Sequence, residues 1–171
     1  MNTLTREKKG GYTQGAWEGK MYDPNLSTKE IAERVRFFFK KQYPTCKVSV
    51  QTQYYSGGSA IHIALMSAPF EILKEPNLED AINAKGYYRT PEEKLESWKH
   101  TYESGHHQIN NYYINDDFYL TEKGKEIIKF LHNSTVVYNF DDSDAQSDYF
   151  HTNFYVHLAV GKWDKPFKIT K

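Results

Sequence analysis

A change of hydrophobic period at Pro44 constrains the fold of this chain more than any other feature of its sequence. Before Pro44, apolar residues recur about every 3.6 positions, which indicates an amphipathic helix, and after it they alternate with polar residues, which indicates β-strands. Ser27 and Glu30 have the spacing of a capping box at a helix start. We therefore predict a helix over residues 27–42. Its apolar stripe would comprise Ile31, Val35, Phe38 and Phe39.

Two alternating segments after this helix predict a β-hairpin. Apolar residues occupy every second position from Cys46 to Val50 and again from Ile61 to Leu65. Residues 54–59 between them read Tyr-Tyr-Ser-Gly-Gly-Ser, and a glycine accepts the positive φ that a tight turn requires. The first half of the chain is therefore expected to begin with a helix-strand-turn-strand unit.

Capping residues and alternation predict the later elements. Thr90, Pro91 and Glu93 mark a helix start, and Gly105 marks its end. The remaining predictions are a helical turn between Pro69 and Pro76, a short helix from Asn77 to Ala84 stopped by Gly86, an extended segment over 106–119, a helix from Thr121 to about His132, a loop over 139–148, and a strand over 154–160.

These elements predict an α+β fold, an antiparallel sheet of at least three strands with the helices packed mainly on one face. We expect one domain over residues 26–171, preceded by an irregular N-terminal arm over residues 1–25. Trp163 and Phe167 would anchor a C-terminal segment that wraps the surface.

Composition excludes several classes of protein. Lys and Arg total 22, and so do Asp and Glu, so a formal charge of zero argues against wholesale polyanion binding but not against a local basic surface. The single cysteine, Cys46, excludes an intramolecular disulfide and a cysteine-based zinc cluster. With no signal-like apolar segment and no run of about 18 apolar residues, we expect a cytoplasmic protein without a membrane partner.

One candidate binding surface combines the first helix with the hairpin turn. Cations at helical spacing can follow phosphates, and nearby aromatic rings can stack on bases or contact a partner protein. Its candidate residues are Arg36, Lys40, Lys47, Tyr54, Tyr55, Gly57 and Gly58. The alternative interpretation is a solvated helix face beside a tyrosine-containing turn.

The acidic segment 141–148 is a candidate metal site, because hard cations take oxygen ligands from alternate positions of a loop. The candidate ligands are Asp142, Asp144, Asp148 and His151. The pattern departs from an EF-hand, since Ser147 replaces the expected glycine and Asn153 the closing glutamate. A solvated acidic loop is the alternative.

Two histidines, His62 and His157, occupy the outward phase of predicted strands. If those strands are neighbours, both side chains lie on one face of the sheet. A metal or nuclease site would also need carboxylates there, and these strands supply none. The sequence contains no nucleophile elbow, P-loop, dinucleotide-binding glycine pattern or His-Glu-x-x-His, so no enzyme class is predicted and no cofactor is expected.

The run from Leu26 to Ile63 resembles the large polyvalent protein associated domain numbered 29. A helix ending in a Tyr-Pro step, a strand containing Lys-x-Ser-Val, and a Tyr-Ser-Gly-Gly turn carry the resemblance, which extends over most of residues 26–167. The matching residues are Lys47, Ser49, Val50, Tyr55, Ser56, Gly57 and Gly58. The departure is Ile63-Ala64-Leu65, where the family's second strand is expected to be more polar.

The resemblance implies a protein of phages, conjugative elements or integrated islands, where such domains are often fused to DNA-handling or defence-countering modules. It implies no catalytic residues. Our leading hypothesis is therefore a small non-enzymatic binding module of a mobile genetic element that contacts nucleic acid or a host protein. The alternatives are a metal-dependent enzyme that uses the segment 141–148 with nearby histidines, and a purely structural interaction partner. The oligomeric state is not predicted.

Overall fold

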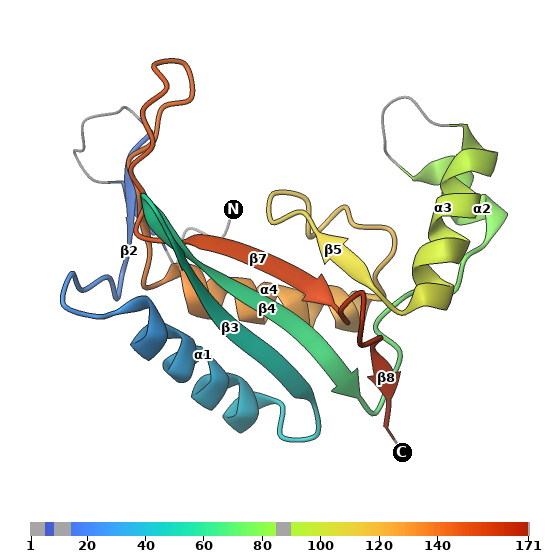
Figure 1. Cartoon of the computed structure of the whole chain (residues 1–171). Coiled ribbons are helices and arrows are strands. Elements are labelled where there is room, and N and C mark those ends of the chain that lie inside the picture. The colour runs from blue at the N-terminus through green and yellow to red at the C-terminus, as the bar shows by residue number, and fades with distance from the viewer. Residues whose placement is uncertain (1–5, 9–14, 85–89, 171) are drawn as a thin grey trace.

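The computed structural model describes residues 6–8 (backbone only), 15–84 and 90–170, and it confirms the α+β class (Figure 1). In chain order the elements are β1 (Arg6–Lys8), β2 (Trp17–Gly19), α1 (Thr28–Gln42), β3 (Lys47–Tyr55), β4 (Gly58–Ala68), α2 (Leu78–Asn83), α3 (Pro91–Ser104), β5 (His107–Ile109), α4 (Glu122–Val136), β6 (Phe140–Asp141), β7 (Tyr155–Val160) and β8 (Lys168–Ile169).

The main sheet has the strand order β3-β4-β7-β5, with β8 pairing to the end of β4. The β3–β4 and β7–β5 pairs are antiparallel, whereas β4–β7 and β4–β8 are parallel. The predicted sheet of at least three strands is confirmed, but it is mixed rather than antiparallel. Alternation within a strand carries no information on the direction of its neighbour, and the long connection from β4 to β7 permits a parallel return.

A smaller sheet, β1-β2-β6, forms where irregular structure was predicted. Strands β1 and β2 lie in the expected N-terminal arm, and β6 lies in the expected loop 139–148. Strands of two or three residues are too short to show a hydrophobic period, so only their tertiary pairing defines them. Gly19 allows this pairing, because a Cβ there would lie 2.3 Å from the carbonyl oxygen of Val137.

Helices α1 and α4 pack side by side against one face of the main sheet, α1 against β3 and β4 and α4 against β7. The predicted capping box is present, since Ser27 Oγ accepts from the N–H of Glu30 and the Glu30 carboxylate accepts from the N–H of Ser27. Between these layers lies the core. Its fully buried members include Ile31, Val35, Phe39, Ile61, Leu65, Ile127, Ile128, Leu131, Leu158 and Val160.

The other predicted helices are also confirmed. Asn77 caps α2, and Thr90 with Glu93 forms the capping box of α3, which ends at Gly105 in the left-handed conformation. Thr121 caps α4, which continues to Val136, past the predicted end at His132. Gly86, the expected stop of α2, lies outside the described residues.

Four local predictions are wrong. Of the segment 106–119, which was expected to be extended, only His107–Ile109 is a strand, and most of residues 111–119 form turns. Phe38 lies at the edge of the apolar stripe, about 100° around the helix from the buried Phe39, and is 40% exposed. Trp163 is 86% exposed and anchors nothing, whereas Phe167 does pack against the core. Between Pro69 and Pro76 the chain is extended rather than helical, and Leu73 pairs with Leu120 in an isolated bridge. In the part of the chain that the structure describes, no helix has the length and apolar character needed to cross a membrane.

Candidate binding surface

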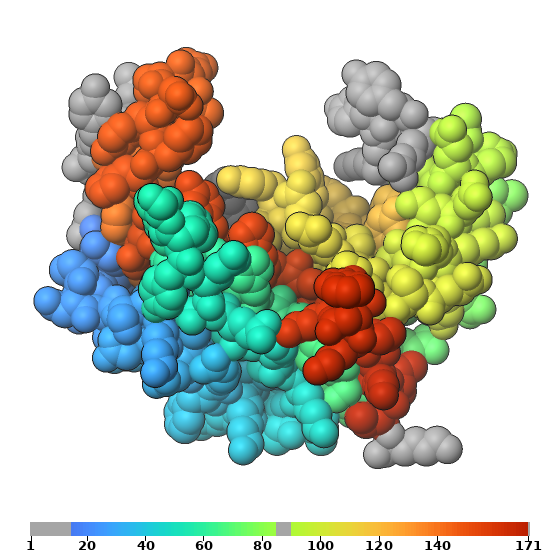
Figure 2. All heavy atoms as spheres, in the orientation of Figure 1, coloured from blue at the N-terminus to red at the C-terminus, as the bar shows by residue number. Residues whose placement is uncertain are grey.

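One face of the main sheet carries no packed helix among those described, because α1 and α4 both pack on the opposite face. We call it the open face. Strand register places on it Ser49, Gln51, Gln53, Tyr55, Gly58, Ala60, His62, Ala64, Tyr155, His157 and Ala159. This set contains rings, amides and small side chains but no carboxylate. Figure 2 shows the molecular surface hollowed above β7, between the orange segment 141–151 and the helices α2 and α3.

The two histidines predicted to share a sheet face do so. His62 and His157 are direct partners on neighbouring strands, and their rings stack with centroids 4.6 Å apart and planes inclined by 15°. His62 Nε2 also lies 2.8 Å from Gln53 Oε1, which fixes the orientation of its ring. Burial lowers the pKa of His62, and the nearby His157 and Lys162 lower it further. His62 is therefore neutral near pH 7.

Two tyrosines border the smallest side chains of the open face. Tyr55 pairs with Gly58 on the neighbouring strand, and Tyr155 pairs with Ala60. Burial raises the pKa of Tyr55, and the nearby Tyr155 raises it further. The Tyr55 ring covers Gly58, where a Cβ would lie 3.3 Å from it. Its hydroxyl donates to the carbonyl oxygen of Ser59 at 3.3 Å. The tyrosines are 44% and 42% exposed, so both are available to a ligand.

A cation reaches the middle of the open face, and β7 has an incomplete strand neighbour along one edge. Lys162 Nζ donates to Gln51 Oε1 at 2.9 Å. Strand β5 pairs only with residues 158–160, so it does not extend beside Tyr155 and His157. There the Asn111 amide donates to the carbonyl oxygen of Val156 at 2.7 Å.

The basic residues of the predicted surface do not form one compact site. Arg36 lies beside β3 and donates to the carbonyl oxygen of Val50, covering an edge of the sheet. Lys47 and Tyr55 lie at opposite ends of β3, about 26 Å apart at about 3.3 Å per residue. Lys40 is exposed on α1, on the other side of the sheet from the open face.

The predicted residues of the hairpin turn do not all lie on the open face. Tyr54 and Tyr55 are adjacent in a strand and so face opposite sides of the sheet, and only Tyr55 belongs to the open face. Gly57 has φ of +91°, in the tight turn between β3 and β4. Gly58 makes room for the Tyr55 ring. The two glycines therefore shape the hairpin.

The acidic segment 141–148 forms a projecting hairpin whose polar groups bond locally (Figure 1). The Asp144 carboxylate accepts from the N–H of Gln146 and from Ser147 Oγ, both at 2.9 Å. Asp142 donates its N–H to the carbonyl oxygen of His151, and the His151 ring packs on Phe140. Asp148 is exposed with φ of +56°. Among the described residues, no three His, Cys, Asp or Glu side chains gather in a way that could hold a metal ion.

Sequence analysis missed several residues of the open face. Gln51, Gln53 and Tyr155 share the phase of His62 and His157, at spacings of two along predicted strands. Extending the histidine argument along each strand would have found them. Lys162 could not have been found in this way, because its position depends on where the chain goes after β7.

Comparison with known proteins gives one match. The family model described as large polyvalent protein associated domain 29 matches residues 26–117, from the residue before the α1 cap to the segment after β5. No curated protein and no solved structure matches the chain.

Proposed function

Because the chain belongs to the family of large polyvalent protein associated domain 29, we propose that it is a small non-enzymatic binding module of a mobile genetic element, and that its open face binds single-stranded nucleic acid. The observation that carries the proposal is the combination of rings and amides on a sheet face to which no described helix packs. A host protein is the competing partner, and the experiment below separates the two.

The rings support base stacking. An unpaired base gains about 1–3 kcal/mol by stacking on an aromatic side chain, and every base has a face that can do so. Tyr55 and Tyr155 are 44% and 42% exposed, so a planar group can stack upon either ring. Strand β5 does not extend beside His157, so β5 does not cover the ring of His157.

The amides and charges support recognition of nucleic acid over an apolar ligand. Gln51 and Gln53 offer donors and acceptors to base edges, and Lys162 places a cation beside Gln51, in the middle of the face. No carboxylate lies on the open face itself, whereas the hairpin at one side of the hollow carries Asp141, Asp142, Asp144 and Asp148. With few cations nearby, the salt dependence should be modest. Two or three phosphate contacts predict a slope of about −1.4 to −2.1 in log affinity against log salt.

The test is fluorescence anisotropy of a labelled single-stranded oligonucleotide of about ten nucleotides at several salt concentrations. Tyr155→Ala and Tyr55→Ala should each weaken binding by about fivefold to more than a hundredfold, which corresponds to the loss of one stacked base. Tyr54→Ala is the matched control, because Tyr54 is adjacent and 62% exposed but faces the opposite side.

Two results would overturn the proposal. Equal losses in Tyr54→Ala and Tyr55→Ala would show that the hairpin, and not the open face, binds the oligonucleotide. No binding of DNA or RNA at low salt would exclude nucleic acid and leave a host protein as the partner.

A further inference from the structure

The open face carries two stacked imidazole rings, those of His62 and His157, which we call the histidine pair. The ring centroids are 4.6 Å apart, and the two residues lie in one cross-strand row with Gln51. The Lys162 ammonium group donates to the Gln51 side chain at 2.9 Å. Three groups that can each carry a positive charge therefore gather around this row.

The hydrogen bond of His62 leaves one of its ring nitrogens free to take a proton. An amide oxygen can only accept, so His62 Nε2 donates to Gln53 Oε1 across the 2.8 Å contact, and the neutral ring has its lone pair on Nδ1. Among the described residues, none is hydrogen-bonded to that Nδ1. Protonation at Nδ1 therefore leaves the contact with Gln53 intact.

The titratable side chains that share or reach the open face with the histidine pair include no carboxylate. They are Tyr55 on β3, Tyr155 on β7 and Lys162, which follows β7. Burial lowers the pKa of His62, and the nearby His157 and Lys162 lower it further. No described helix packs over this face. The protonated pair thus has no anionic partner on the face, and a bound anion would supply one.

We propose that a single strand of nucleic acid bound to the open face takes up one proton from solvent on the histidine pair, so that its affinity rises as the pH falls below about 7. The inference rests on the proposed function and adds the regulation of the same site. A phosphate beside the rings stabilises the imidazolium form, because a nearby opposite charge favours a charged group. Two positive rings at 4.6 Å would repel each other, so the pair takes up one proton and not two. Since the coupling is reciprocal, the proton strengthens binding as much as binding favours the proton.

Fluorescence anisotropy with an oligonucleotide of about ten thymidines, carrying a pH-insensitive dye, tests the proposal at pH 8.0 and pH 5.5. Thymine and the phosphodiester do not titrate between these values, so a change in affinity belongs to the protein. The dissociation constant should be lower at pH 5.5 by about threefold to thirtyfold, the effect of one added charged contact. The slope of log affinity against log salt should become more negative by about 0.7. Circular dichroism at both pH values checks that the protein is folded.

Two further measurements on the wild type locate and count the proton. NMR follows the ring protons of His62 and His157 as the pH is lowered, with and without the oligonucleotide, and the pKa of the pair should be higher in the complex. Calorimetry in two buffers with different heats of ionisation should count the uptake of up to about one proton per complex near pH 6.

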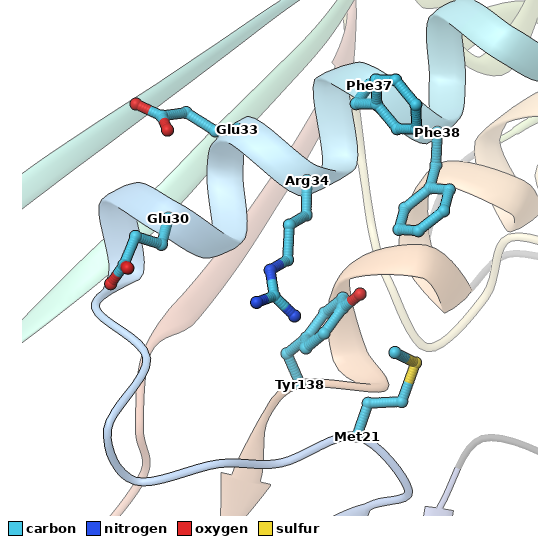
Figure 3. A pocket seen from close by; sticks show the side chains of 7 residues that line it. All are labelled: Met21, Glu30, Glu33, Arg34, Phe37, Phe38 and Tyr138. Carbon is cyan, nitrogen blue, oxygen red and sulfur yellow. The ribbon is translucent and has the colours of Figure 1, made fainter.

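Variants test which groups take up the proton. The double variant His62→Gln and His157→Gln should lose most of the pH dependence, whatever its affinity at pH 8.0. His100→Gln is the matched control, because His100 is exposed on α3, outside the open face. Arg34→Gln controls for the loss of a charge elsewhere, since Arg34 extends over Tyr138 in a hollow beside α1, on the other side of the sheet (Figure 3). Both controls should keep the wild-type pH dependence.

The outcomes separate this inference from the proposed function. Equal affinity at both pH values, or a pKa of the pair that the oligonucleotide does not change, would overturn the inference and leave the proposed function standing. A pH dependence retained in the double variant would assign the proton to another group and also overturn the inference. No binding at either pH would overturn both.

Discussion

The close approach of α4 to the segment after β4 predicts that Gly124→Ala destabilises the protein. In an isolated helix the same change would stabilise by about 0.8–1.0 kcal/mol, because glycine is a poor helix former. Here, however, a Cβ at Gly124 would lie 2.7 Å from the carbonyl oxygen of Ile72 and 3.2 Å from its side chain. The tertiary contact therefore opposes the helix propensity.

The size of the effect follows from that contact. Ordinary contact begins at 3.4 Å, so α4 and Ile72 must separate by about 0.7 Å. The Ile72 oxygen accepts from the N–H of Thr121 at 2.9 Å, and this hydrogen bond would lengthen. Overpacking costs about 1–3 kcal/mol and a weakened hydrogen bond up to about 1 kcal/mol. After the propensity gain of about 0.8–1.0 kcal/mol, these terms leave a loss of up to about 3 kcal/mol, with a central value of about 1.5 kcal/mol.

Urea unfolding followed by circular dichroism measures this loss, and a thermal midpoint lower by about 3–7 °C should accompany it. Gly15→Ala is the control, because Gly15 has no atom near the Cβ position and a change of less than about 0.5 kcal/mol is expected. A Gly124→Ala variant as stable as the wild type, or more stable, would refute the packing argument.

Two further predictions concern His62 and Trp98. The pKa of His62 is lowered in the folded state. The unfolded chain therefore binds more protons as the pH falls through the ordinary histidine pKa of about 6.5, and stability should fall as the pH drops from 7.5 to 5.5. His62→Gln should reduce that fall in thermal midpoint, and an equally steep fall would contradict the assignment. Trp98→Phe should cost about 2 kcal/mol in urea unfolding, since the buried indole N–H donates to the carbonyl oxygen of Lys74 at 2.9 Å. Wild-type stability in this variant would mean that the bond contributes little.

Local signals predicted the helix starts and the first hairpin well. Ser27, Thr90 and Thr121 each cap the helix that their sequence pattern indicated. A cap is an interaction within four residues, so the sequence contains both partners. The alternation in β3 and β4 is similarly local and gave the correct inward residues.

Features that depend on distant partners could not be predicted in the same way. The parallel pairing of β4 with β7 joins residues that are more than ninety positions apart, such as Ala60 and Tyr155. The strand β2 exists because it pairs with β6. Trp163 is apolar but follows the last long strand, and nothing in its neighbourhood along the chain indicates that it stays in solvent.

Part of the candidate site could be predicted from the sequence, and part could not. The shared face of His62 and His157 follows from their strand phase once the strands are neighbours, and the structure makes them neighbours. The grouping of Lys47 with Tyr54 and Tyr55 relied on closeness in sequence. In the structure, the length of β3 separates Lys47 from the two tyrosines, and strand alternation points Tyr54 and Tyr55 to opposite sides of the sheet.

The central claim is that the open face binds single-stranded nucleic acid, and an NMR titration with a short oligonucleotide tests it most directly. The account predicts that ring protons of His62, His157 and Tyr155 shift upfield and that backbone shifts concentrate in β3, β4 and β7, because a stacked base shields the ring beneath it. Shifts confined to α1 or to the hairpin at 141–151, or no shifts at low salt, would contradict it.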